Sequence, residues 1–152
     1  MDLLQSSRTI GSWCWRQARA FEIVGSWVQP EADAEAKIQF FSHSRRKGAH
    51  AQLLSALLPA IAGSDPAEFV EPGTGDLELI GALEGASSGT TRARLAALYG
   101  VLAPREVAEI RDFLGRAQPV ASMPSIRVAA AVLADEEQDL RAGAVLLSRV
   151  GG

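Results

Sequence analysis

The two histidines of the chain, His43 and His50, are the side chains best suited to proton transfer near neutral pH. They lie seven residues apart in the segment FFSHSRRKGAHAQLLSALLP, residues 40–59. Seven residues make about two turns of an α-helix, so a helix here places both imidazoles on one face. Three consecutive cations, residues 45–47, lie between them. Successive helical residues turn by about 100° and cannot share a face, and Lys47 is the cation that we expect to point inward.

Carboxylates interrupt the apolar lines of other segments, and a charge on such a line indicates chemistry or ion pairing. Glu106 breaks one apolar line. In LADEEQDL, residues 133–140, either Glu136 or Glu137 must face inward. Glu22 adjoins the apolar face of a segment near the start of the chain. Each helical segment therefore offers a polar group near its midpoint.

The composition limits the class of protein. The chain has 152 residues, 47% of them apolar, and a net charge of −3, so we expect one domain over residues 1–152 without nucleic-acid binding. One cysteine, Cys14, excludes an intramolecular disulfide or a thiolate zinc site. No basic start precedes an apolar run, and no stretch approaches eighteen apolar residues, so we expect a cytoplasmic protein without a signal peptide or membrane span.

The apolar residues recur every three or four positions, which predicts an all-α fold. We predict long helices over residues 5–28, 31–61, 91–117 and 123–150, and a short helix over 77–84. Within the third, the ring of Pro104 collides with the carbonyl group of Gly100, which predicts a kink there; the alternative is two helices joined at that point. Short, long and short connections are typical of a four-helix bundle with a long crossover between helices two and three.

Three segments, FEIVGSW, GAHAQLLSALLP and VLADEEQDLRAG, look like those of the ferritin-like superfamily, in particular its small bacterial members. The resemblance implies a bundle in which one Glu on helices one and three and a Glu-x-x-His motif on helices two and four hold two iron ions. The positions that match in this chain are Glu22, His50, Glu106, and Glu136 or Glu137.

Both Glu-x-x-His motifs are incomplete. In the second helix, Lys47 stands three residues before His50, where the motif has Glu. The fourth helix has no histidine: the residue three positions after Glu136 is Asp139, and the residue three positions after Glu137 is Leu140. An ammonium group repels a metal ion and could neutralise the glutamates in its place. We therefore expect a ferritin-like bundle with a lost or altered di-iron centre.

Three hypotheses for function follow. The first is a biosynthetic acid–base enzyme that acts on a small molecule without a cofactor, of the isomerase, cyclase or lyase type. Its catalytic residues would be Glu22, His50, Glu106 and Glu136, and its pocket would be lined by Trp15, Tyr99, His43 and Lys47. Of these, His43 fits a structural or near-surface position better.

The second hypothesis is an iron or manganese oxidase or oxygenase, with Glu22, His50, Glu106 and either Glu136 or Glu137 as ligands. The third is a bundle without catalytic activity that binds a partner or forms a homodimer, in which the inward charges pair and fix the register of the helices.

Overall fold

The structure is a computed structural model that describes residues 3–58, 65–116 and 123–150. Every regular element in these ranges is helical, which confirms the predicted all-α class. The elements are α1 (Leu3–Trp27), α2 (Ala34–Ser55), the short 3₁₀ helix η1 (Pro66–Phe69), α3 (Asp76–Ala86), α4 (Thr91–Ala97), the π-helical turn η2 (Leu98–Leu102), α5 (Ala103–Arg116) and α6 (Met123–Arg149). No helix within the described ranges is long and apolar enough to span a membrane.

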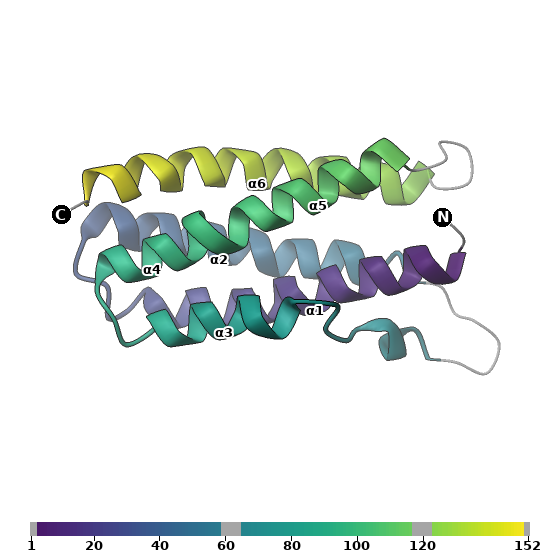
Figure 1. Ribbon diagram of the computed structural model, residues 1–152, viewed down its shortest axis with the longest axis horizontal. Coiled ribbons are helices and arrows are strands. Elements are labelled where there is room, and N and C mark those ends of the chain that lie inside the picture. Colours follow the sequence, from purple (N-terminus) through teal and green to yellow (C-terminus); the bar gives the residue numbers. More distant parts are fainter. Residues whose placement is uncertain (1–2, 59–64, 117–122, 151–152) are drawn as a thin grey trace.

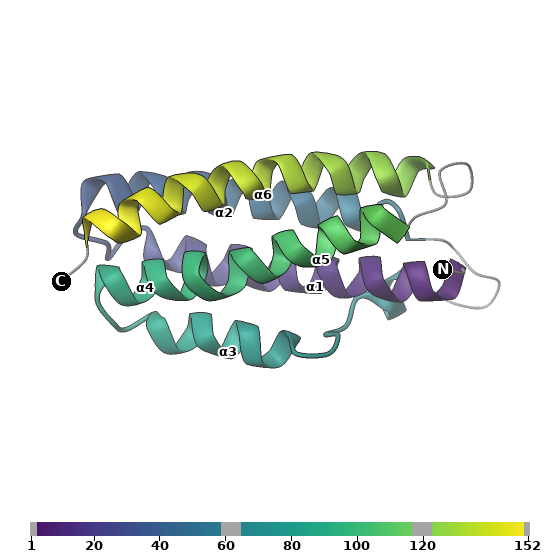
Figure 2. The ribbon, with the colours of Figure 1, turned by 45° about the horizontal axis from the view of Figure 1, so that its top comes forward.

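Four long rods pack side by side along the bundle (Figure 1). Helices α1 and α6 run in one direction, while α2 and the continuous rod α4–η2–α5 run in the other. Helix α3 is a fifth, shorter helix outside this group, beside α1, and it leads the chain back along the bundle to the start of α4 (Figure 2). This arrangement brings together the midpoints of α1, α2, α6 and the α4–η2–α5 rod.

The bounds of α2 differ from the predicted range of 31–61. The side chain of Asp33 accepts a hydrogen bond from the backbone N–H of Ala36 at 3.0 Å, so α2 begins three residues later than predicted. The helix ends at Ser55, and the chain turns over residues 56–58. The rest of the predicted helix lies outside the described residues.

Pro104 changes the third rod without breaking it. The backbone N–H of Ala103 bonds the carbonyl of Leu98, five residues earlier, so the turn before Pro104 is π-helical. This wider turn accommodates the proline ring and its missing N–H group. The turn carries Tyr99, which therefore reaches the interior of the bundle.

The buried apolar residues form two clusters. One surrounds Val24, Trp27 and Leu98, and the other surrounds Ile10 and Phe113. These clusters occupy the two ends of the bundle, and the polar midpoints of the helices meet between them. The fold therefore encloses a layer of buried charged side chains in the middle of an apolar core. This charged layer is centred on Lys47, Glu106 and Glu136.

Candidate functional site

The centre of the charged layer is the ammonium group of Lys47 on α2. Lys47, Glu106 and Glu136 are each 0% exposed. The Lys47 Nζ donates to Glu106 Oε2 at 3.0 Å and to Glu136 Oε1 at 3.3 Å, and lies 3.4 Å from Gln17 Oε1. One cation thus joins four helices, α1, α2, α5 and α6.

Lys47 and the neighbouring carboxylates stabilise each other's charged forms. Burial by itself lowers the pKa of Lys47, but the neighbouring carboxylates Glu106 and Glu136 outweigh it and raise that pKa above its ordinary value. Burial likewise raises the pKa of Glu136, yet Lys47 and His43 hold it well below its ordinary range. Lys47 and Glu136 are therefore both charged at neutral pH.

Both imidazoles lie against Glu136. The Nε2 atom of His43 is 3.0 Å from Glu136 Oε2, and its Nδ1 atom is 2.9 Å from the Tyr99 hydroxyl. His50 faces two carboxylates: Nε2 is 2.8 Å from Asp135 Oδ2, and Nδ1 is 3.4 Å from Glu136 Oε1 without hydrogen-bond geometry. Burial lowers the pKa of His50, but Glu136 and Asp135 more than offset this effect, and the pKa is raised.

Tyr99 closes the layer on the side of α6. A Cβ atom at Gly143 would overlap the Tyr99 ring, so α6 needs a glycine there for the ring to lie close. The Tyr99 hydroxyl also accepts a hydrogen bond from Gln39 Nε2 at 3.0 Å. Its burial raises the pKa of Tyr99 well above the ordinary value, so the phenol stays neutral and can donate to His43.

Arg16 on α1 extends the layer toward α3 and α5. Its Nη1 donates to Asp76 Oδ1 at 2.9 Å and its Nη2 to Glu109 Oε2 at 2.8 Å. Its Nε lies 3.4 Å from Glu106 Oε1, and neither of these two buried atoms has a hydrogen-bond partner. Burial raises the pKa of Glu109, but Arg16 and Arg105 reverse the effect and lower it.

A second branch leaves the layer on the α2–α6 side. Asp139 accepts hydrogen bonds from Gln39 and Arg46 and lies 3.6 Å from His43 Nε2. Arg46 is partly exposed, so this branch ends at solvent.

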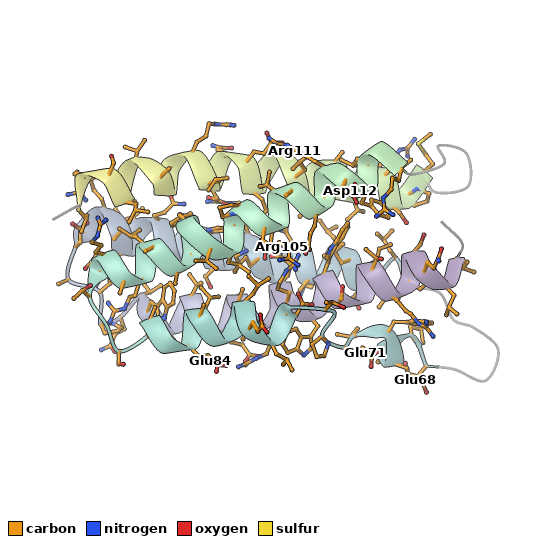
Figure 3. The ribbon with its side chains drawn as sticks, viewed as in Figure 1. Glu68, Glu71, Glu84, Arg105, Arg111 and Asp112 are labelled. Carbon is orange, nitrogen blue, oxygen red and sulfur yellow. The ribbon has the colours of Figure 1, made fainter. Side chains whose placement is uncertain are left out.

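A surface pocket of about 200 Å³ lies where Arg16 approaches the outside. It is lined by Thr9, Ser12, Trp13, Arg16, Gly73, Thr74, Asp76, Glu109, Asp112, Phe113 and Arg116. Asp112 stands on the outward face of α5, and Arg105, which pairs with Glu109, lies nearer the middle of that rod (Figure 3). The pocket therefore opens directly onto the end of the charged layer.

The structure places most of the sequence-predicted residues in this layer. Glu106, Glu136 and His50 are buried there, as are Lys47 and Tyr99. Of the two adjacent glutamates, Glu136 faces inward, whereas Glu137 faces outward and pairs with Arg111 at 3.0 Å. His43 is fully buried at the centre, which excludes the near-surface alternative and leaves the structural one.

Two residues lie elsewhere. The side chain of Glu22 is 60% exposed and pairs with Arg19 at 2.5 Å, so the prediction that it faces the core is wrong. The inward line of α1 runs through Gln17, Ala20 and Val24, and Glu22 falls on the opposite face of the helix. Trp15 is partly buried and packs on an apolar cluster, away from the pocket described above.

Sequence reasoning missed several members of the layer, among them Arg16, Gln17, Asp76, Glu109, Asp135 and Asp139. Gln17 lies on the apolar line of the first helix, and this was an available signal. Asp76 follows a glycine-rich connection, and only the folded chain shows that it meets Arg16.

The residues present do not fit a di-iron centre. An ammonium group lies between the carboxylates that would hold the metals, and Glu22 is outside the core. In the part of the chain that the structure describes, no three or more His, Cys, Asp and Glu side chains converge closely enough to hold a metal ion.

Comparison with protein families, curated proteins and solved structures finds no match to this chain. Its function must therefore be argued from the site itself.

The adjacent glutamates of α6 give a matched test of the layer. We expect Glu136→Gln to lower the free energy of unfolding by about 3–5 kcal/mol, because it leaves buried Lys47 and the imidazoles without their shared anion. Glu137→Gln loses only a surface pair and should change it by about 0–1 kcal/mol. Urea unfolding at pH 7 measures both, and equal effects would contradict the proposed importance of the buried pair.

The pKa of His50 predicts a pH dependence of stability. Because the folded value is raised, the stabilisation is complete below the unfolded pKa of about 6.5 and is lost as the pH rises through the folded value. The groups that face His50 are Asp135 and Glu136 on α6 and Lys47 on its own helix. Stability should therefore fall over the pH range that begins at about 6.5 and extends upward through the raised folded value.

The matched variant is His50→Asn, which cannot titrate. Urea unfolding at several pH values should give a flatter profile for this variant over the same window. A wild-type profile that rises with pH, or one that the substitution leaves unchanged, would contradict the assignment to His50.

Proposed function

We propose that this protein is a metal-independent acid–base enzyme acting on a small molecule bound in the pocket beside Arg16. One observation carries the proposal: charged contacts run without interruption from the pocket to a buried histidine. The series passes from Glu109 through Arg16, Glu106, Lys47 and Glu136 to His50, with successive contacts of 2.8 to 3.4 Å.

Stability alone is a weak reason for such a layer. Replacing a buried ion pair by apolar side chains is often neutral or stabilising, so stability does not by itself account for a core of this kind. Strongly perturbed titratable groups beside a pocket are a common mark of functional sites. The lowered pKa of Glu109 and the raised pKa of His50 are at opposite ends of the series.

Glu109 is the residue best placed to meet a substrate. It lines the pocket, its side chain is 28% exposed, and Arg16 and Arg105 hold it ionised. An ionised carboxylate can accept a proton from a bound molecule. Arg16 positions Glu109 and connects it to Glu106, whose Oε1 atom has no hydrogen-bond partner.

The opposite end of the series meets solvent at Asp135, whose side chain is 46% exposed. His50 can therefore exchange its own proton with water there, away from the pocket. His50 is suited to this step, because an imidazole between two carboxylates can take and release a proton near neutral pH. Because the Arg16 guanidinium stays protonated, Glu109 returns its proton to the bound molecule or to water in the pocket.

The pocket favours a compact molecule that carries an amine or another cationic group. Three carboxylates line it against two guanidinium groups, so the lining carries an excess of one negative charge. Asp76 and Glu109 pair with Arg16, and Asp112 pairs with Arg116. Trp13 and Phe113 form one wall, with ring centroids 5.1 Å apart in an edge-to-face arrangement. Aromatic faces beside carboxylates suit a small organic cation.

The finer architecture is also a proposal. We propose a ferritin-like bundle, supported by the four long rods and the return of the chain through α3. The cytoplasmic location, bacterial source and biosynthetic role are proposed from the sequence resemblance alone. Of the other hypotheses, the metal oxidase is not favoured, since its carboxylates already pair with cations. The non-catalytic bundle, including a homodimer, is the alternative that the following experiment separates.

Solvent-isotope exchange tests the enzyme directly, because an acid–base enzyme transfers protons between its substrate and water. The protein is incubated in D₂O with a small-molecule extract of the source cells, and mass spectrometry identifies compounds that gain deuterium at carbon. We expect a cationic compound to exchange with the wild type and to slow by at least about 100-fold with Glu109→Gln.

The matched control is Glu84→Gln. Glu84 is an exposed glutamate on α3 that pairs with Arg19 outside the pocket (Figure 3), and its replacement should leave the exchange unchanged. Exchange that is equal in the Glu109→Gln variant would reject the role of the pocket. An absence of exchange with the wild type would favour the non-catalytic bundle.

A further inference from the structure

The pocket beside Arg16 contains a cation of the chain at its exposed edge. Arg116 is the last residue of α5, and its Nη2 atom lies 2.9 Å from Asp112 Oδ2. Both residues line the pocket, and their side chains are 60% and 65% exposed. An exposed ion pair of residues four apart on a helix contributes little to stability. A ligand can therefore separate this pair easily.

Asp112 is the carboxylate of the pocket that a ligand can engage. Asp76 and Glu109 both accept hydrogen bonds from Arg16, at 2.9 and 2.8 Å. Arg16 is itself buried, so these two contacts are fixed by the charged layer. Asp112 pairs instead with Arg116, a long side chain at the end of a helix that can turn toward solvent. The excess negative charge of the lining is therefore most accessible at Asp112.

We infer that Asp112 selects the ligand of this pocket, and that the cationic group of the ligand displaces the Arg116 guanidinium group from it. Arg116 is then a competitor, built into the chain, for the carboxylate that the ligand needs. The ligand class is a small organic cation with N–H donors, such as an amine or an amidine. The inference rests on the proposed function, because it uses the same pocket, but it concerns binding and not proton transfer.

The spacing of residues on α5 places this subsite beside the group that would take a proton. Glu109, Asp112 and Arg116 follow one another at intervals of three and four residues, so they share one face of the helix. The Cβ atoms of residues three apart on a helix are separated by about 5–6 Å. A cation held at Asp112 therefore places the neighbouring atoms of the ligand beside Glu109, along the aromatic wall of Trp13 and Phe113.

A structural ion pair and a competing one predict different outcomes. In a structural pair, the loss of either partner has the same consequence, because the same contact is lost. In a competing pair, the loss of Asp112 removes the anchor of the ligand, whereas the loss of Arg116 removes its competitor. The two substitutions should then change the affinity in opposite directions. A cation in the last turn of α5 also suits the helix dipole, but that interaction affects the stability of the helix.

The probe for the experiment is benzamidine, a planar cation whose paired N–H groups match a carboxylate and whose ring suits the aromatic wall. Benzamide has nearly the same shape without the charge and is the matched neutral compound. The affinity of each compound is measured at pH 7 by NMR titration for the wild type, Asp112→Asn and Arg116→Gln. Melting curves check that each variant is folded.

The chain offers a matched control pair on the same helix. Arg111 on α5 pairs with Glu137 on α6 at 3.0 Å, and neither residue lines the pocket (Figure 3). Arg111→Gln and Glu137→Gln remove the same charges as the test variants from a surface ion pair. They therefore report the effect of net charge alone.

We expect Arg116→Gln to bind benzamidine about 2–5-fold more tightly than the wild type, and Asp112→Asn to bind it about 5–10-fold more weakly. Each control variant should stay within about 2-fold of the wild type, because salt screens distant surface charges. Benzamide should bind more weakly than benzamidine and should respond to neither test substitution.

Three outcomes would overturn the inference. They are effects of the same sign in Asp112→Asn and Arg116→Gln, effects that the control variants match, and benzamidine that binds neither the wild type nor Arg116→Gln. The proposed enzyme is judged separately by deuterium exchange. Opposite effects on affinity without exchange would keep the cation subsite and remove the enzyme, whereas exchange that depends on Glu109, with affinities that neither test variant changes, would keep the enzyme and overturn the inference.

Discussion

The contact of one buried ammonium with two buried carboxylates is the interaction on which the rest of this structure depends. Lys47, Glu106 and Glu136 come from three helices, and each is fully buried. An unpaired charge in this position is strongly unfavourable, so the three helices must meet in one register. The apolar clusters at the two ends of the bundle supply the burial, and the charged layer determines which residues face one another.

The layer also sets the chemistry available to the protein. A resident metal pair would be a source of redox and Lewis-acid chemistry, whereas an ammonium, two imidazoles and several carboxylates supply proton donors and acceptors. These groups reach the surface at three places: beside the pocket at Arg16, at Asp135 and at Arg46. A single lysine in the sequence therefore changes both how the core is neutralised and which reactions it can support.

Much of this arrangement was predictable from the sequence because helical periodicity exposes a charge on an apolar line. Glu106, Glu136 and Lys47 were found in this way. Glu22 was misplaced because it was predicted to adjoin the apolar face of the first helix, whereas its side chain lies on the opposite face and pairs with Arg19. Arg16 and Asp76 were missed because their pairing depends on how the connection before α3 packs on α1, which no local pattern records. The π-helical turn before Pro104 could not be predicted either. The sequence shows where the proline ring would collide with the preceding turn, but not that the folded chain relieves the collision by forming a π-helical turn.

The most direct measurement is nitrogen NMR of the lysine side chains in protein labelled with ¹⁵N-lysine, because the chain has only two, Lys37 and Lys47. The account predicts that Lys47 gives the signal of a charged ammonium with slowly exchanging protons, and that this signal persists above the ordinary lysine pKa. A Lys47 side chain that is neutral at pH 7, or whose protons exchange as rapidly as those of Lys37, would contradict the central claim that a buried ammonium holds this core together.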